Sequence, residues 1–147
     1  MGFLHTLKAV LVLLLLMASM TLYLVALVIG RIFLPKLTYS RFAQGIQEHY
    51  LLVFTWFIEA PKARKILFSG DRVPTGECAL VIPNHAASHG DWAPLYSLAA
   101  RSHGLGSVKT VSKSILKFIP LFGWSMYLME WPFLKRKWLS DKDYLAN

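Results

Sequence analysis

The sequence has little cysteine, few acidic residues and no glycine-rich nucleotide motif. Cys78 is the single cysteine, so no disulfide can form within the chain, which fits a cytosolic environment. Neither a P-loop nor a dinucleotide-binding G-x-G-x-x-G pattern occurs. The G-x-S-x-G elbow of serine hydrolases is also missing. These absences argue against a P-loop NTPase, a nicotinamide-dependent enzyme and an elbow-type serine hydrolase.

One long hydrophobic run lies near the start of the chain. Residues 9–30 contain no charged side chain, and about 20 apolar residues suffice to cross a hydrocarbon core of about 30 Å. A signal-peptide core is shorter, about 7–15 residues, so we predict a retained transmembrane helix, with a cleaved signal as the alternative. The basic residues Arg31, Lys36 and Arg41 follow the run, whereas Lys8 precedes it. The positive-inside rule then places the rest of the chain in the cytosol.

The chain after Pro35 divides into an amphipathic helix and a globular part. Apolar residues between positions 39 and 58 recur with a period close to 3.6, and Pro61 ends the pattern. This indicates a helix lying on a membrane or packed on the domain. We therefore predict three parts: a transmembrane helix over 1–35, an amphipathic membrane-associated helix over 36–61 and a domain over 62–147.

Strand and helix patterns alternate in the third part. Buried strands are expected at 78–82, 107–112 and 130–134, and helices at 91–100, 114–118 and 121–129. Cys78 would then be a buried structural thiol. An alternation of strand and helix is typical of an α/β fold with a mainly parallel sheet.

Polar side chains cluster where the first of these strands ends. Residues 80–92 read LVIPNHAASHGDW, which places His85 just past the strand and Asp91 at the start of the next helix. Ligands bind at the carboxyl ends of strands in open α/β sheets, and a His–Asp pair is the minimum for general-base activation of a hydroxyl. The alternative is a polar turn in which Ser88 or Asp91 caps the helix.

A metal site at the same place is less well supported. His85, His89 and Asp91 would be its ligands, with the two histidines in an H-x-x-x-H spacing. Ala86 stands where such motifs carry glutamate, and Gly90 interrupts a helix. We therefore expect no metal.

The second half of the chain is strongly basic. Between positions 101 and 138, Glu130 is the single acidic residue among seven Lys and Arg: Arg101, Lys109, Lys113, Lys117, Lys135, Arg136 and Lys137. Such a segment suits anionic lipid headgroups or phosphorylated ligands beside a membrane anchor, or it is a solvated surface. Nucleic acid has nothing but this charge bias in its favour, so we expect no nucleic-acid partner.

Two stretches together resemble a known family. The first, IPNHAASHGDWAPLYSLA, is similar to the Asn-His…Asp block of the glycerolipid acyltransferases that acylate lysophosphatidic acid. The second, SVKTVSKSILKFIPLFGWSMYLMEWPFLKRKW, is similar to the segment that follows in the eukaryotic members, with its F-x-P-x-x-G-W and F-[IL]-x-R elements. The resemblance covers residues 78–143.

The resemblance implies an acyl transfer from acyl-CoA to the free hydroxyl of lysophosphatidic acid in phospholipid biosynthesis. His85 would be the general base, Asp91 would hold and polarise it, and Arg136 and Lys113 would bind the acceptor phosphate. Acyl-CoA would be the donor substrate, with no cofactor. The resemblance also implies membrane attachment, the endoplasmic reticulum as location, and core positions for Trp92, Phe118 and Trp124.

Two features depart from the family pattern. Asp91 follows His85 by six positions, whereas the family spacing is five. A later E-G-T-R block that binds the acceptor phosphate is absent, so the expected fold is the N-terminal part of an α/β acyltransferase domain, truncated on its C-terminal side. The alternative to an active enzyme is therefore a catalytically inactive, membrane-anchored fragment with a lipid-binding or scaffold role.

Overall fold

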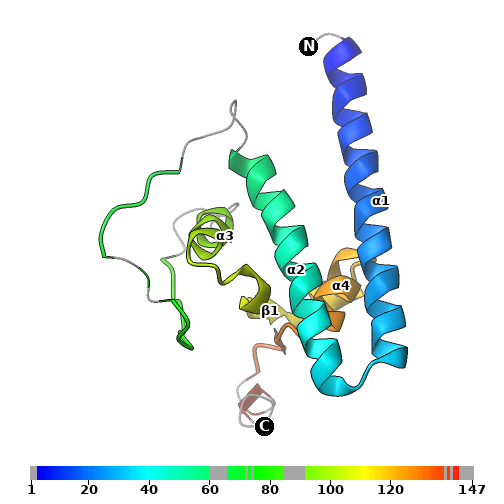
Figure 1. The fold of residues 1–147 in the computed structure, drawn as a ribbon. Coiled ribbons are helices and arrows are strands. Elements are labelled where there is room, and N and C mark those ends of the chain that lie inside the picture. The colour runs from blue at the N-terminus through cyan, green and yellow to red at the C-terminus, as the bar shows by residue number, and fades with distance from the viewer. Residues whose placement is uncertain are drawn as a thin grey trace. The chain divides into compact units, whose positions relative to one another are not determined.

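The structure, a computed structural model, describes residues 3–59, 66–71, 73, 75–84, 92–137, 139 and 141–142. These residues are mostly helical (Figure 1), and they form two compact units. The first unit contains the chain up to Ala43 together with the chain from Lys109 onward, and the second spans Gln44–Val108. The boundary between the two units falls inside the helix that spans Lys36–Glu59.

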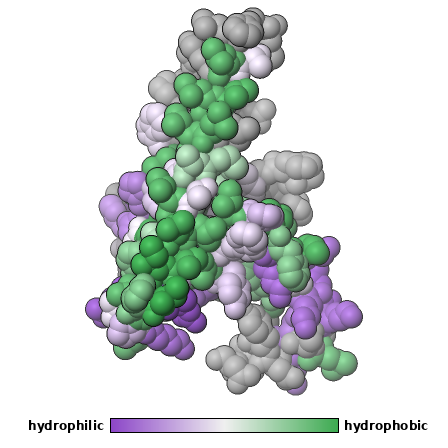
Figure 2. All heavy atoms as spheres, turned by 90° about the vertical axis from the view of Figure 1, so that its right-hand side faces the viewer, coloured by the Kyte–Doolittle hydropathy of each residue, from purple (hydrophilic) through white to green (hydrophobic). Residues whose placement is uncertain are grey.

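Helix α1 (Phe3–Phe33) is the long apolar helix that the sequence predicts, and it ends just before Pro35. Its segment Leu14–Phe33 is long and apolar enough to cross a membrane, and most of that segment is not buried. Figure 2 shows apolar side chains over much of the α1 surface. The hydroxyls of Ser19 and Thr21 donate to the carbonyls of Leu16 and Met17, both at 2.8 Å. The helix thus satisfies these two polar groups internally, as a hydrocarbon environment requires.

Helix α2 (Lys36–Glu59) confirms the predicted helix, although its buried face is not purely apolar. In the second unit, Gln47, Leu51 and Thr55 recur at intervals of four residues and are buried, which places them on one face of the helix. The Gln47 amide donates to the carbonyls of Leu105 and Val108 at 2.8 and 2.7 Å. These bonds hold the 3₁₀ helix η1 (Leu105–Ser107) against α2.

Helix α3 (Trp92–Arg101) ends one residue past the predicted end at position 100. His103 adopts a left-handed backbone conformation with φ 55°, and the amide of Gly104 donates to the carbonyl of Ala99 at 2.9 Å. The amide of His103 donates to the carbonyl of Ala100. This pair of bonds is the Schellman arrangement, which satisfies the last carbonyls of a helix.

The first unit contains a small parallel sheet. Strand β1 (Ser112–Lys113) pairs with β2 (Phe133–Leu134), with Ser112 opposite Phe133 and Lys113 opposite Leu134. The 3₁₀ helix η2 (Ser114–Phe118) and helix α4 (Phe122–Leu128) lie between the two strands in sequence. The predicted parallel pairing is therefore confirmed for these strands. β2 lies within the predicted strand 130–134, whereas β1 shares only Ser112 with the predicted strand 107–112.

A glycine brings η2 and α4 together. A Cβ atom on Gly123 would collide with the carbonyl oxygen of Leu116 and would lie 2.9 Å from backbone atoms of Lys117. No side chain fits so close to a backbone, so the glycine of the F-x-P-x-x-G-W stretch has a packing reason. Because the buried face of α4 consists of Gly123, Ser125 and Met126, the aromatic residues of the helix point elsewhere.

The C-terminal end of α4 is capped by the residues that follow it and by the distant Tyr39. Glu130 has φ 60°, its amide donates to the Tyr127 carbonyl, and the Trp131 amide donates to the Met126 carbonyl, a second Schellman arrangement. The hydroxyl of Tyr39, which is almost fully buried, donates to the carbonyl of Leu128 at 2.6 Å. Burial raises the pKa of Tyr39, so the phenol stays a donor.

Two predictions about the segment before the motif are wrong. Residues 78–84 form no strand, and Cys78 is exposed rather than buried. An extended segment becomes a strand only when a neighbour accepts and donates its backbone hydrogen bonds. The part of the chain that the structure describes supplies no such neighbour to residues 78–84.

The expected core positions of three aromatic residues are also wrong. Trp92, Phe118 and Trp124 keep 44%, 67% and 49% of their surface exposed. For Trp124 the reason is the α4 face described above, because Gly123 and Met126 take the buried side. The predicted division into 1–35, 36–61 and 62–147 remains a prediction.

Candidate functional site

The proposed catalytic pair lies outside the described residues. His85 and Asp91, with His89 between them, fall in the segment 85–91, for which no geometry is given. The description stops at Asn84 and resumes at Trp92, the first residue of α3. The contact between His85 and Asp91, and the effect of the extra residue between them, therefore remain predictions.

Aromatic packing fixes the start of α3, directly after Asp91 in sequence. The ring of Trp92 stacks on Phe54 of α2 with centroids 5.1 Å apart, and Tyr96 meets the same Phe54 edge-on at 6.4 Å. Tyr96 is buried. The first turn of α3 thus has a defined place on α2 within the second unit.

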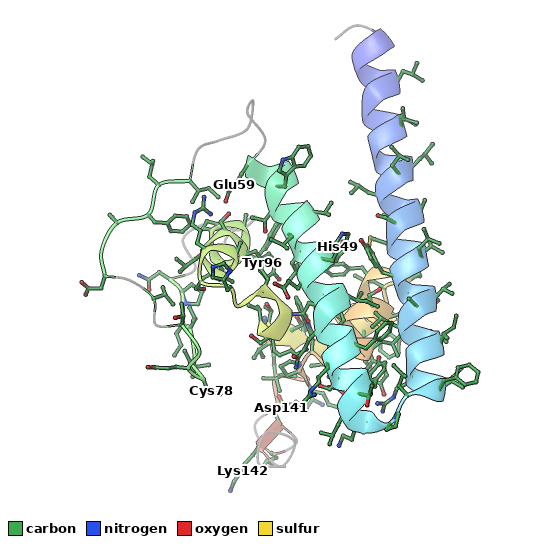
Figure 3. The ribbon with its side chains drawn as sticks, in the orientation of Figure 1. His49, Glu59, Cys78, Tyr96, Asp141 and Lys142 are labelled. Atoms are coloured by element: carbon green, nitrogen blue, oxygen red, sulfur yellow. The ribbon has the colours of Figure 1, made fainter. Side chains whose placement is uncertain are left out.

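An ion pair fixes the other end of α3. Arg101 donates two hydrogen bonds to the carboxylate of Glu59, at 2.8 and 2.9 Å, and its guanidinium lies 4.9 Å from the ring centroid of Phe68. The hydrogen bond from Arg101 lowers the pKa of Glu59 to about 2. Figure 3 shows Glu59 near the end of α2 and Cys78 on the extended segment. Arg101 therefore joins α2, α3 and the start of residues 66–84.

The structure brings Lys113 and Arg136 to one edge of the first unit. Lys113 is the last residue of β1, and Arg136 follows the last residue of β2 by two positions. Because the strands are parallel and Lys113 stands opposite Leu134, both cations follow the carboxyl end of the sheet. This is the edge at which parallel sheets bind ligands.

Both cationic side chains at this edge are exposed. Within the described residues, neither the Lys113 ammonium nor the Arg136 guanidinium is engaged in a hydrogen bond or ion pair. Positive groups without an intramolecular partner are available to an anion such as a phosphate.

Asp141 is a residue of this edge that the sequence does not single out. Its carboxylate accepts the backbone amides of Lys135 and Lys137, each at 2.9 Å, and its own amide donates to the Lys137 carbonyl at 3.0 Å. Asp141 is buried, and Figure 3 shows it beside Lys142 near the C-terminal end. The signal that could have pointed to it is a pair of aspartates, Asp141 and Asp143, shortly after a basic run.

A hollow of about 670 Å³ adjoins the same edge in the first unit. It combines cations from three elements with an aromatic wall, and the carboxylates of Glu130 and Asp141 also line it. Its other lining residues are Arg31, Ser114, Lys117, Tyr127, Leu128, Trp131, Phe133 and Lys135. Arg31 belongs to the last turn of α1, so the hollow lies at the end of the candidate membrane span.

The metal site considered for His85, His89 and Asp91 also lies outside the described residues. Among the residues that the structure describes, no three His, Cys, Asp or Glu side chains gather closely enough to hold an ion.

Comparison with known proteins identifies the family. A family model of acyltransferases matches residues 65–147. The chain is 35% identical over 118 residues to 1-acyl-sn-glycerol-3-phosphate acyltransferase 2 of Arabidopsis thaliana, which covers 78% of the chain and 30% of that relative. The chain belongs to the 1-acyl-sn-glycerol-3-phosphate acyltransferase family. The resemblance drawn from the two sequence blocks is thereby confirmed.

Other members of the acyltransferase family are also similar to this chain. The probable 1-acyl-sn-glycerol-3-phosphate acyltransferase 5 of Arabidopsis thaliana is 36% identical over 98 residues, covering 67% of the chain and 26% of the relative. Lysocardiolipin acyltransferase 1 of Gallus gallus is 34% identical over 102 residues, 65% of the chain and 27% of the relative. The matched part thus spans between 26% and 30% of the length of these relatives. No solved structure is significantly similar to the chain.

Proposed function

We propose that the chain attaches to a membrane and transfers a fatty acyl group from acyl-CoA to the free hydroxyl of lysophosphatidic acid. Its family supports acyl transfer to a lysophospholipid. The donor, the acceptor and the catalytic residues are the parts that we propose. The domain would be of the α/β class, of which the described residues contain one parallel strand pair.

In the proposed mechanism His85 removes the proton of the acceptor hydroxyl as its oxygen attacks the thioester carbonyl carbon. The C–S bond then breaks, and His85 returns the proton to the CoA thiolate as it leaves. Asp91 would accept a hydrogen bond from the imidazole and stabilise the imidazolium. Charges appear only transiently at the reacting atoms, and the step uses no metal or cofactor.

The observation that supports the proposal is that Lys113 and Arg136 both belong to the carboxyl edge of the strand pair. The sequence separates these two cations by more than twenty positions, and the parallel pairing returns them to one side. A phosphate monoester carries close to two negative charges at pH 7. Two exposed cations at a strand edge form a suitable site for such a group.

The hollow beside this edge suits the rest of an anionic amphiphile. Its cations Arg31, Lys117 and Lys135 can neutralise a headgroup, while Tyr127, Trp131 and Phe133 offer apolar surface. The apolar helix α1 would hold the chain at the membrane that contains the lipid substrate. We propose the endoplasmic reticulum as the location, with the domain on the cytosolic side.

The test is acyl-CoA-dependent acylation of lysophosphatidate by membranes that contain this chain. We expect product from the wild-type chain, background from His85→Ala, and wild-type rates from His49→Ala, which removes an exposed histidine of α2. Equal background signals from the wild-type chain and His85→Ala would contradict the enzymatic proposal for this chain.

The second candidate is an inactive lipid-binding or scaffold chain. It is favoured by the extra residue between His85 and Asp91, which alters the spacing of the catalytic block. It predicts binding of lysophosphatidate through Lys113 and Arg136 without any acyl transfer, so a binding assay beside the activity assay separates the two.

A further inference from the structure

The backbone around Arg136 is in a conformation that needs support. Arg136 has φ 60°, the left-handed region that side-chain-bearing residues rarely adopt. It lies two residues past β2, where no further strand pairing holds the chain in the described residues. A conformation of this kind persists when the surroundings over-determine it, and such residues cluster at functional sites.

The carboxylate of Asp141 supplies that support. It accepts the amides on both sides of Arg136, from Lys135 at 2.9 Å to one oxygen and from Lys137 at 2.9 Å to the other. The return bond from the Asp141 amide to the Lys137 carbonyl, at 3.0 Å, closes the loop. Hydrogen bonds to an ionised acceptor are among the stronger ones, and Asp141 is 8% exposed, which protects them from water.

The bonds to Asp141 leave the Arg136 side chain unengaged. The Asp141 carboxylate accepts hydrogen bonds from main-chain amides and not from the Arg136 guanidinium. The Arg136 side chain remains exposed. The arrangement fixes the direction in which Arg136 leaves the sheet edge while keeping the guanidinium available for a ligand.

We infer that Asp141 is a positioning residue, which sets the backbone of Arg136 so that its guanidinium meets the acceptor phosphate beside Lys113. The inference rests on the proposed role of Arg136 as a phosphate contact. It adds a residue that touches no substrate and acts through two main-chain amides.

The test measures binding of the full chain to phosphatidylcholine vesicles that contain either lysophosphatidate or zwitterionic lysophosphatidylcholine. We expect Arg136→Ala to reduce the preference for lysophosphatidate about tenfold, the loss of a charge-assisted contact. Asp141→Asn, which replaces one accepting oxygen with a donor, should reduce it about three- to tenfold and leave binding to lysophosphatidylcholine unchanged.

Two controls match this substitution. Asp71→Asn makes the same chemical change at an exposed site in the second unit, and Lys142→Ala alters the exposed neighbour of Asp141. Figure 3 shows Lys142 extending away from the chain. Both variants should keep the wild-type preference. A loss of the preference in Lys142→Ala would contradict a specific action of Asp141.

A double variant separates positioning from general damage. In the Arg136→Ala background, Asp141→Asn should have almost no further effect, because both changes remove one contact. An equal effect in both backgrounds, or a parallel loss of lysophosphatidylcholine binding, would overturn the inference.

Hydrogen exchange makes the inference testable without a ligand. The amides of Lys135 and Lys137 should exchange slowly in the wild-type chain and in Arg136→Ala, and faster in Asp141→Asn. Unchanged exchange in Asp141→Asn would overturn the inference. If exchange changes as expected but Arg136→Ala binds like the wild-type chain, the proposed phosphate role of Arg136 fails instead.

Discussion

The two segments that carry the family blocks are built in opposite ways. Residues 78–84 lead into the His85 motif, yet they are extended, exposed and without regular structure. Residues 112–141 carry no predicted general base, yet their described part forms a strand pair, a close contact between η2 and α4, and a turn closed by Asp141. The second segment finds its hydrogen-bond partners within about thirty positions, or in α2 through Tyr39. The strand predicted at 78–82 would need partners on its sides, so its formation depends on distant parts of a chain.

The largest loss of stability should come from disrupting the contact between η2 and α4 in the second segment. Gly123→Val would place side-chain atoms where the carbonyl oxygen of Leu116 lies. We expect a loss of more than about 3 kcal/mol in the free energy of unfolding, above the usual cost of overpacking. Chemical denaturation followed by circular dichroism in detergent measures it.

The matched control for Gly123→Val is Gly45→Ala in α2. A Cβ on Gly45 meets nothing within 4 Å, so this change should stabilise the helix by about 0.5–1 kcal/mol. A tolerated Gly123→Val would show that η2 and α4 are not in close contact.

A pair of truncations compares the two segments directly. Met126→Ala removes a side chain that is 5% exposed and should cost about 2–3 kcal/mol. Leu80→Ala removes one that is 84% exposed and should change stability by less than about 0.5 kcal/mol. The same denaturation assay measures both. Equal costs would mean that residues 78–84 are packed as a strand after all.

Removing the hydrogen bond from Tyr39 to the end of α4 should cause a smaller loss of stability. Tyr39→Phe removes the hydroxyl that donates to the Leu128 carbonyl and should cost about 0.5–1.5 kcal/mol. Tyr127→Phe is the control, because Tyr127 is 65% exposed and should be neutral. Thermal unfolding of both variants tests this. If Tyr39→Phe left the unfolding temperature unchanged, the Tyr39 hydroxyl would not contribute to the stability of the second segment.

The smallest effect is the pH dependence of the ion pair beside residues 66–84. The pKa of Glu59 is about 2 in the folded chain, below its ordinary value of 4.5, because Arg101 donates to the carboxylate. A lowered folded pKa stabilises the fold above about pH 4.5, and this contribution disappears as the pH falls toward about 2. Because the pair is partly exposed to solvent, the contribution should stay below about 1 kcal/mol.

Glu59→Gln should flatten this acid dependence in unfolding experiments between neutral and acid pH, whereas Glu77→Gln, an exposed change on the extended segment, should not. An identical pH dependence in the wild-type chain and Glu59→Gln would show that the pair contributes nothing to the fold.

Local patterns predicted the helices well. The uncharged run and Pro35 determined α1, and the 3.6-residue period and Pro61 determined α2, because helix hydrogen bonds close within four residues. The helix predicted at 91–100 likewise corresponds to α3 (Trp92–Arg101). The strands were less predictable, since β1 and β2 each retain two residues and 78–82 has no strand partner in the described chain.

By itself the sequence determined the long apolar helix, the basic second half and membership of an acyltransferase family, because run lengths, charges and motif residues do not depend on folding. Tertiary structure decided which of the many cations share an edge. A parallel pairing brings Lys113 and Arg136 to the same edge, and Asp141 holds the turn between Lys135 and Lys137 through bonds to main-chain amides. Every residue except proline has a backbone amide, so the amino-acid sequence does not reveal which amides a carboxylate will bind.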